Sequence, residues 1–219
     1  MITAQIASIP DREGLLKKTM ESLISQVDQL NIMLNCYDRT PSFCYKPKVQ
    51  FYHLDNEKGD AAKFYGLKNI GGYIFTCDDD LAYPPDYVET MTKKLHEYND
   101  KVILTNHGRI MMEKPVTNSY TSRKKAFHCL KEETLETFID IGGTGAMAWH
   151  SDAFFPDYNR IDIANMADIW VAMFAHEQNV KILHNPHREC WIKYLHPTWT
   201  IWDEHFPNPG PQTDLYNSF

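Results

Sequence analysis

Three consecutive aspartates follow a short apolar stretch near the middle of the 219-residue chain. Tyr73 to Cys77 is apolar and rich in β-favouring residues, which predicts a short buried strand that ends at Asp78, Asp79 and Asp80. Alternate side chains share a face in an extended chain, so we expect Asp78 and Asp80 to point one way and Asp79 the other. Adjacent carboxylates repel one another unless a cation lies between them. The fold must therefore bring positive charge to the end of this strand.

A hard divalent cation would suit this triplet. Mg²⁺ and Mn²⁺ take oxygen ligands, and they accept one or two protein carboxylates together with phosphate oxygens. Ligands of open α/β sheets bind beyond the carboxyl ends of the strands, which is where the triplet is expected. The alternative is a solvated acidic turn whose last aspartate caps a helix that begins near Pro85. The triplet alone leaves both interpretations open.

Strand-like and helix-like segments alternate along most of the chain, which predicts an α/β fold with a largely parallel sheet. Residues 107–136 show no clear period, and the run Arg123-Lys124-Lys125 favours an exposed loop. No linker divides the chain, so we expect one domain. The expected strands are residues 2–9, 32–34, 49–54, 73–77, 102–105, 139–149 (a pair interrupted by glycines) and 180–183, and the expected helices are residues 15–24, 61–70, 85–98 and 166–178.

Composition excludes several classes of protein. The net charge of −7 argues against nucleic acid as the main partner. No apolar run is long enough for a transmembrane segment, and the first residues resemble a strand more than a signal peptide. The five cysteines show neither zinc spacing nor a disulfide framework, which is typical of reduced thiols in the cytoplasm. The absence of a Walker loop and of Gly-x-Gly-x-x-Gly argues against ATPases and dinucleotide enzymes.

From Ile2 to about Trp191 the sequence resembles the nucleotide-sugar-dependent glycosyltransferases of the GT-A fold, closest to the inverting family 2 type. This resemblance implies a Rossmann-like, mostly parallel nucleotide-binding sheet flanked by helices. It also implies one domain over residues 1–219, in which residues 1–105 bind the nucleotide and residues 106–219 form the acceptor side. The motifs that carry the resemblance are Pro10 and Arg12 after the first strand, Gly59 with Ala62-Lys63 and Gly66, the aspartate triplet, Gly142-Gly143-Thr144-Gly145, and Ala167-Asp168-Ile169-Trp170.

The resemblance implies transfer of a hexose or deoxyhexose from a UDP-sugar donor to a hydroxyl of a glycan acceptor, with Mn²⁺ or Mg²⁺ as the cofactor. The Gln-x-x-Arg-Trp motif of processive synthases is missing, which favours transfer of a single sugar. The size of the chain also resembles one domain of the multi-domain glycosyltransferases of chlorella viruses. That likeness implies further domains on a larger polypeptide and a location in the host cytoplasm.

The resemblance assigns roles to the acidic residues and to one histidine. Asp80 and Asp78 are the expected metal ligands, and the family implies that one of this pair can instead hold ribose hydroxyls. Asp78 and Asp79 are also expected to contact the nucleotide-sugar donor. His187 follows the last strand and is a further candidate ligand of the metal or the phosphates; the alternative is a loop histidine bonded to backbone. Asp168 is the expected general base that removes the proton of the acceptor hydroxyl.

Other interpretations of Asp168 stay open. It could be an acid at a helix N-terminus, favoured by the helix dipole without any chemical role. Three nearby acids also compete for the role of base, namely Asp152, Asp157 and Asp162.

Further contacts to the donor are expected at the ends of the early strands. Pro10 and Arg12 follow the first strand, and Arg12 and Lys63 suit the diphosphate or the ribose. Lys63 could instead pair with the triplet. Asp38 is expected at the uracil, although the segment Asn35-Cys36-Tyr37-Asp38 departs from the paired acids of the family. Asp60 is expected at the base or the ribose, or as the cap of a helix that begins at Ala61.

Glycines and tryptophans give weaker signals. Residues 142–145 are expected to let the backbone approach the sugar closely, or to form an ordinary tight turn. Aromatic rings could stack on sugar faces, although buried tryptophans usually belong to the core. The tryptophans concerned are Trp149, Trp191, Trp199 and Trp202.

Two other functions stay open. A sugar nucleotidyltransferase also uses a metal and an α/β sheet, but it needs a glycine-rich basic loop where this chain has Pro10-Asp11-Arg12-Glu13. A non-catalytic domain that binds a nucleotide sugar or a glycan is also compatible, because the late acidic motif around Asp168 has one acid where the family has two.

Overall fold

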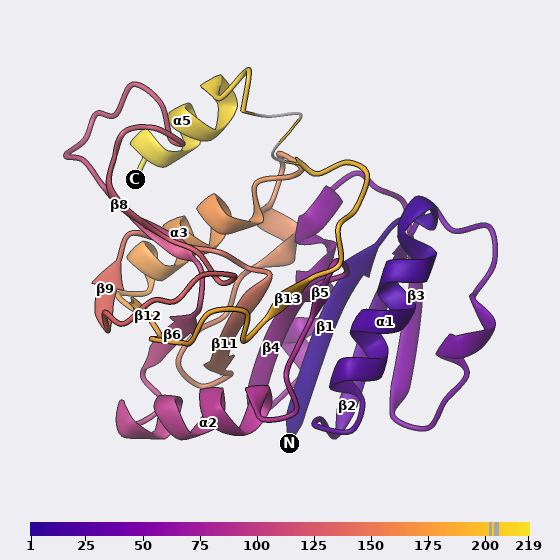
Figure 1. The fold of residues 1–219 in the computed structure, drawn as a ribbon. Coiled ribbons are helices and arrows are strands. Elements are labelled where there is room, and N and C mark those ends of the chain that lie inside the picture. Colours follow the sequence, from indigo (N-terminus) through magenta and orange to yellow (C-terminus); the bar gives the residue numbers. More distant parts are fainter. Residues whose placement is uncertain (202, 204–205) are drawn as a thin grey trace.

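An eight-stranded sheet forms the centre of the protein, with the strand order β3-β2-β1-β4-β11-β6-β12-β9 (Figure 1). The computed structural model describes residues 1–201, 203 and 206–219. All strands of this sheet run parallel except β11 and β9, which are antiparallel to their neighbours. The strands are β1 (Ile2–Ser8), β2 (Gln29–Asn35), β3 (Val49–Leu54), β4 (Tyr73–Asp78), β6 (Val102–Thr105), β9 (Thr137–Ile139), β11 (Ala146–His150) and β12 (Lys181–His184). The predicted α/β class is confirmed, and this mostly parallel sheet flanked by helices is consistent with the GT-A fold.

Helices cover both faces of the sheet. The helices α1 (Glu13–Leu23) and α2 (Tyr87–Glu97) lie on the same face, where their apolar stripes enter one hydrophobic cluster (Figure 1). The opposite face is covered by α3 (Ala167–Glu177), which belongs to a second cluster and is buried along most of its length. Because α3 also contacts the C-terminal helix α5 (Gly210–Asn217), it is apolar on more than one side.

Among the described residues, no helix combines the length and the apolar character that crossing a membrane requires.

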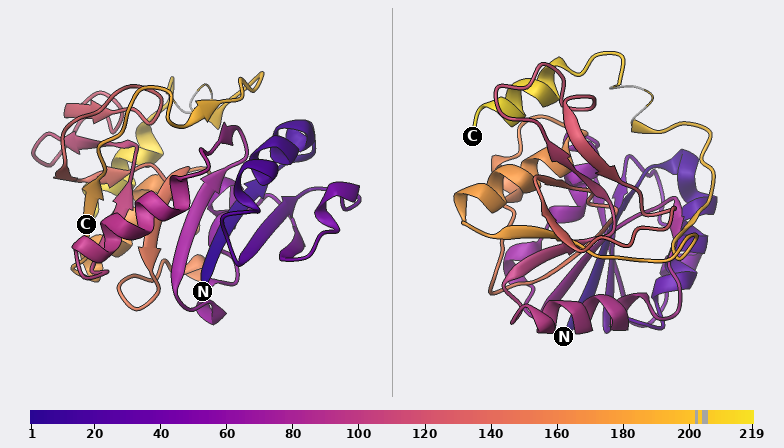
Figure 2. Two further views of the ribbon diagram at one scale, coloured as in Figure 1. Left: turned by 60° about the horizontal axis from the view of Figure 1, so that its bottom comes forward. Right: turned by 60° about the vertical axis from the view of Figure 1, so that its left-hand side comes forward.

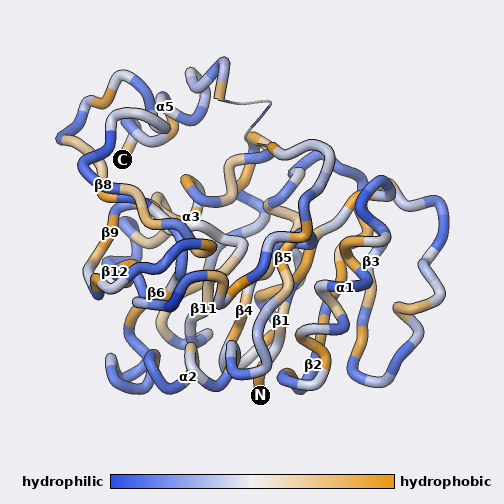
Figure 3. The backbone as a smooth tube through the Cα atoms, in the orientation of Figure 1, coloured by the Kyte–Doolittle hydropathy of each residue, from blue (hydrophilic) through white to orange (hydrophobic). Residues whose placement is uncertain are grey.

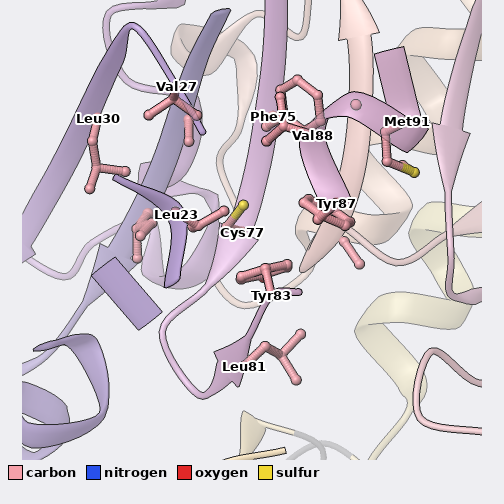
Figure 4. Packing of buried hydrophobic residues seen from close by; sticks show 14 of the residues in the cluster. Leu23, Val27, Leu30, Phe75, Cys77, Leu81, Tyr83, Tyr87, Val88 and Met91 are labelled. Atoms are coloured by element: carbon pink, nitrogen blue, oxygen red, sulfur yellow. The ribbon is translucent and has the colours of Figure 1, made fainter. Parts of the chain in front are cut away.

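The strand β4 rests on a dense apolar layer. Phe75 and Cys77 point from β4 into the cluster beneath α2, where Phe75 meets the ring of Tyr87 (Figure 4). Leu81 and Tyr83, directly after the aspartate triplet, pack into the same cluster (Figure 4). The triplet is therefore anchored from both sides by buried residues, which fixes where its carboxylates can lie.

Two small sheets lie outside the central one. One has the order β10-β7-β8 and the other pairs β13 with β5. The expected loop at Arg123-Lys124-Lys125 is wrong, because these residues begin β8. Their side chains are exposed, and β8 lies at the edge of its sheet. Figure 3 shows the start of β8 as hydrophilic. The strands are β5 (Leu81–Ala82), β7 (Gly108–Met111), β8 (Arg123–Phe127), β10 (Ile141–Gly142) and β13 (Lys193–Tyr194).

The helix expected over residues 61–70 does not form. Two short 3-10 segments replace it, at Gly59–Phe64 and Leu67–Asn69. Gly66 separates them with a φ of 74°, in the left-handed region that favours glycine, so an α-helix cannot continue through it.

The chain after β12 crosses the side of the sheet where β1 and β4 end. The N-terminus marks the opposite side of the molecule, and residues 193–201 lie at the carboxyl ends of the strands (Figures 1 and 2), where Trp199, Thr200 and Ile201 share a pocket lining with the triplet. Leu195 fixes this crossing by donating its backbone N–H to the carbonyl of Asp80 at 2.8 Å. The C-terminal segment thereby forms part of the surroundings of the triplet.

We expect Phe75→Ala to lower the free energy of unfolding by about 3–5 kcal/mol, because it leaves a cavity in a fully buried site. The matched control is Phe155→Ala, since Phe155 is 38% exposed, and here we expect a loss below about 1 kcal/mol. Urea unfolding followed by circular dichroism measures both values. Equal losses in the two variants would contradict the assignment of the core.

Candidate functional site

A pocket of about 340 Å³ opens at the carboxyl ends of β1, β2 and β4. Its lining includes the whole aspartate triplet, Arg12 and Lys63 from the first half of the chain, and Asp168 from the second half. Five aspartates and three cationic side chains line the pocket among the described residues. The sheet topology thus collects charged residues that are up to 156 positions apart in the sequence.

Protein cations neutralise the triplet. Lys63, whose side chain is only 2% exposed, forms an ion pair with Asp78. Arg12 Nη1 lies 2.8 Å from Asp79 Oδ1 and 3.4 Å from Asp80 Oδ2. The pairing of Lys63 with the triplet is therefore present, and so is the positive charge that the sequence requires.

The expected alternation of the three side chains is wrong. β4 ends at Asp78, and Asp79 and Asp80 lie in the turn that follows, so the two-residue period of a strand no longer applies. As a result Asp79 and Asp80 both reach Arg12, while Asp78 faces Lys63. Ser8 at the end of β1 also donates its hydroxyl to Asp79 Oδ2 at 2.6 Å.

Burial and like charge raise the pKa values of three acids in the pocket, namely Asp60, Asp79 and Asp80. Burial raises the pKa of Asp80 to about 7, assisted by the charges of Asp78 and Asp79 and opposed by Arg12. Burial also raises the pKa of Asp60 to about 7, and Lys63 opposes this shift. Burial alone would lower the pKa of Lys63, but the carboxylates of Asp78 and Asp60 outweigh it and raise the pKa. The site therefore holds excess negative charge, which a further cation would relieve.

A divalent cation fits this donor set with help from a ligand. No group of three His, Cys, Asp or Glu side chains is placed to form a complete metal cage within residues 1–201, 203 and 206–219. Mg²⁺ commonly takes only one or two protein carboxylates and completes its shell with waters and phosphate oxygens. The Asp78 side chain is 43% exposed and Asp80 lines the pocket beside it, so two carboxylates are accessible for that arrangement.

Asp168 lies in the first turn of α3 and is held by the glycine-rich segment. Its Oδ1 accepts hydrogen bonds from the backbone N–H of Thr144 at 2.8 Å and from the Thr144 hydroxyl at 2.9 Å. The three competing acids do not line the pocket: Asp157 accepts a bond from Asn159, Asp152 lies beside His150, and Asp162 is exposed. Among these four acids, Asp168 is the one that the fold brings to the pocket.

Two glycines of the segment that holds Asp168 lie close against other pocket side chains. A Cβ atom on Gly145 would overlap Oδ2 of Asp78, and one on Gly143 would lie 2.7 Å from Cδ2 of His107. The close approach made by this segment is therefore to the side chains of Asp78 and His107.

Of the other residues expected to contact the donor, one lines the pocket and two do not. Asp60 lines the pocket, and it accepts the backbone N–H of Ala167 at 3.3 Å, so it contacts the start of α3 and not a helix beginning at Ala61. Pro10 and Asp38 are exposed and lie outside the pocket lining. Asn35 occupies the end of β2 instead, because β2 closes three residues before Asp38 and the chain then turns away.

His187 is not brought to the triplet. Its Nδ1 lies 2.9 Å from the carbonyl oxygen of Asn185 and its Nε2 lies 3.2 Å from that of His128. It is buried outside the pocket lining, and its backbone pairs with Glu133. The arrangement matches a loop histidine bonded to backbone and offers no free nitrogen toward Asp78 or Asp80.

The tryptophans separate into core and pocket residues. Trp149 is fully buried in the cluster beneath α3, and Trp191 packs on Tyr87 and donates to Asp86 at 3.0 Å. Trp199 lines the pocket and accepts a hydrogen bond from Arg12 Nη2 on its backbone oxygen at 2.7 Å. Trp202 lies outside the described residues.

Several pocket residues carry no recognisable sequence signal. Thr144 is the exception, because it lies inside the glycine-rich motif of residues 142–145. His107, Arg109, Tyr120 and Gln212 also line the pocket. They lie in segments without a clear period, and only the tertiary fold brings them together.

We expect His107 to stay neutral to unusually low pH, because burial lowers its pKa from 6.5 to about 4 despite the opposing charge of Asp168. Between these two values the unfolded chain binds a proton that the folded protein excludes. The free energy of unfolding should therefore fall as the pH is lowered through this window. NMR titration of the His107 ring, assigned with His107→Gln, measures the midpoint, and a midpoint at or above 6.5 would contradict the burial argument.

Comparison with known proteins identifies the family of this chain. A family model described as glycosyl transferase family 2 matches residues 10–151, which is more than half of the chain. The matched span contains Arg12, Lys63, the aspartate triplet and the glycine-rich segment, and it ends before Asp168. No curated protein matches the sequence. The chain belongs to glycosyl transferase family 2, and its general chemistry is glycosyl transfer.

Proposed function

We propose that this protein transfers a single sugar from a UDP-sugar to a hydroxyl of a glycan, with inversion at the anomeric carbon and with Mn²⁺ or Mg²⁺ as the cofactor. The observation that carries the proposal is one pocket with the aspartate triplet and Asp168 both in its lining. An inverting displacement needs the leaving diphosphate and the base on opposite faces of the sugar. A pocket with acids on two walls suits that requirement.

The triplet side suits the donor. Asp78 and Asp80 would hold the divalent cation, which when bound neutralises charge on the nucleoside diphosphate. Arg12 already contacts Asp79 and Asp80, so it lies within reach of phosphate oxygens bound beside them. Lys63 supplies a second buried positive charge next to Asp78. These contacts support the proposal that the triplet side binds the metal and the diphosphate.

The Asp168 side suits proton removal. Thr144 occupies Oδ1 with two hydrogen bonds and so fixes the orientation of the carboxylate. Oδ2 makes no hydrogen bond to any residue in the described part of the chain, so it is free to accept the proton of an acceptor hydroxyl. A positioned carboxylate with one free oxygen is the arrangement that a general base needs.

We expect Asp80→Asn to weaken Mn²⁺-dependent binding of UDP by at least about tenfold and to abolish transfer, because an amide is a much poorer metal ligand than a carboxylate. Isothermal titration of UDP with and without Mn²⁺ measures the effect. Asp11→Asn is the matched control, since Asp11 is an exposed acid outside the pocket lining. Unchanged metal-dependent binding in Asp80→Asn would refute the assigned metal site.

We expect Asp168→Asn to lower turnover by about 10²–10⁴-fold while UDP affinity changes less than about twofold. The asparagine can still accept both hydrogen bonds from Thr144, so the fold of this wall is retained. Steady-state release of UDP during transfer measures turnover, and Asp162→Asn serves as the control. A loss smaller than about tenfold would reject Asp168 as the base.

A further inference from the structure

The pocket has a third wall that the proposed function does not use. It consists of Arg109 from β7, Tyr120 from the segment before β8, and Gln212 from α5, and we call it the β7–α5 wall. The Arg109 guanidinium carbon lies 5.4 Å from the centroid of the Tyr120 ring. Gln212 Nε2 donates a hydrogen bond to the Tyr120 hydroxyl at 3.3 Å. The three side chains therefore form one continuous polar and aromatic surface.

Hydrogen-bonding capacity on this wall is unused. Arg109 Nε and Gln212 Oε1 are both buried without a hydrogen-bond partner among the described residues. Within the same residues, the Arg109 guanidinium forms no ion pair, although Arg12 and Lys63 in the same pocket both do. Buried polar groups in folded proteins nearly always have partners, so a donor and an acceptor left unpaired beside a pocket indicate a missing ligand.

The unpaired groups of Arg109 and Gln212 have opposite hydrogen-bonding roles, which restricts the chemistry of a ligand that could satisfy both. Arg109 can only donate hydrogen bonds, whereas the Gln212 carbonyl can only accept them. A hydroxyl group does both, so two neighbouring hydroxyls on a sugar ring could satisfy both side chains, with the ring against Tyr120. A carboxylate or phosphate would satisfy Arg109 and leave the Gln212 carbonyl unpaired.

Charge also disfavours an anion on this wall. Five aspartates line the pocket against three cationic side chains, so it is already acidic among the described residues. Burial lowers the pKa of Arg109, and the charge of Asp168 opposes this shift, so the two groups interact. An anionic group beside Arg109 would face the repulsion of Asp168, whereas a neutral ring would not.

The wall is held in place before any ligand arrives. Ser119 donates its backbone N–H to the Thr213 hydroxyl at 3.0 Å. Asn217 makes two bonds to the backbone of Val116, each 2.9 Å long. These contacts clamp α5 onto the segment that carries Tyr120, so binding here requires little reorganisation.

We propose that the β7–α5 wall is the acceptor subsite and that it binds a neutral pyranose through adjacent hydroxyls. This inference rests on the proposed function, since it places the acceptor sugar on the Asp168 side of the pocket. It makes Arg109, Tyr120 and Gln212 the residues that determine acceptor specificity. It also gives α5, which lies beyond the span matched by the family model, a direct part in that specificity.

The test uses the full chain saturated with UDP and Mn²⁺. Neutral methyl pyranosides, each paired with its uronate, are titrated and followed by saturation-transfer NMR. We expect at least one neutral glycoside to bind, and its uronate to bind more weakly. Arg109→Met and Gln212→Met should each lower the affinity for the neutral glycoside by at least about fivefold, since each substitution removes a hydrogen bond to it. Arg160→Met is the matched control, because Arg160 pairs with Glu177 outside the pocket lining.

Each other outcome overturns the inference in a distinct way. A uronate that binds more tightly than its neutral partner refutes a neutral ligand. A neutral glycoside whose affinity is unchanged in Arg109→Met and Gln212→Met refutes the location. If UDP binds with Mn²⁺ but no glycoside does, the acceptor subsite is wrong while the donor proposal stands. If UDP does not bind at all, the proposed function fails and the subsite fails with it.

Discussion

The ion pairs between the aspartate triplet and the cations Lys63 and Arg12 are the constraint on which the rest of the site depends. Three carboxylates at the end of a buried strand repel one another, and this repulsion must be offset before β4 can end there. Arg12 comes from the segment after β1, and Lys63 from the 3-10 segment before β4. Both are delivered by the parallel pairing of β1 with β4, so the sheet and the charge balance form together.

Much of the triplet side follows from the sequence because its signals are local. The apolar run before Asp78 predicts β4, and pairing with the triplet is one of the two roles expected for Lys63, the one that the structure shows. The order of the glycine-rich segment and of Asp168 along the chain, which is typical of the family, also points to Asp168, and the fold brings this residue to the pocket. Local sequence patterns do not predict the structure where one backbone angle determines it. At Gly66 the positive φ interrupts the expected helix, and two 3-10 segments form instead.

Other differences between expectation and structure concern where side chains lie after a strand ends. Asp38 and His187 each follow a strand, but the chain turns away from the pocket before Asp38, and backbone oxygens surround the ring of His187. Arg109 and Gln212 show the opposite case. They are 103 positions apart, and the packing of α5 against residues 116–120 brings them to one wall. No period or motif within a short window contains that information.

Gly145 shows how a residue without functional groups governs the chemistry of the site. Even the smallest side chain at this position would take the space that Asp78 Oδ2 occupies. An alanine there would displace the carboxylate and loosen its ion pair with Lys63. Any other amino acid at position 145 therefore requires the Asp78 carboxylate to move, so a residue that carries no reactive group sets the position of one that the site uses.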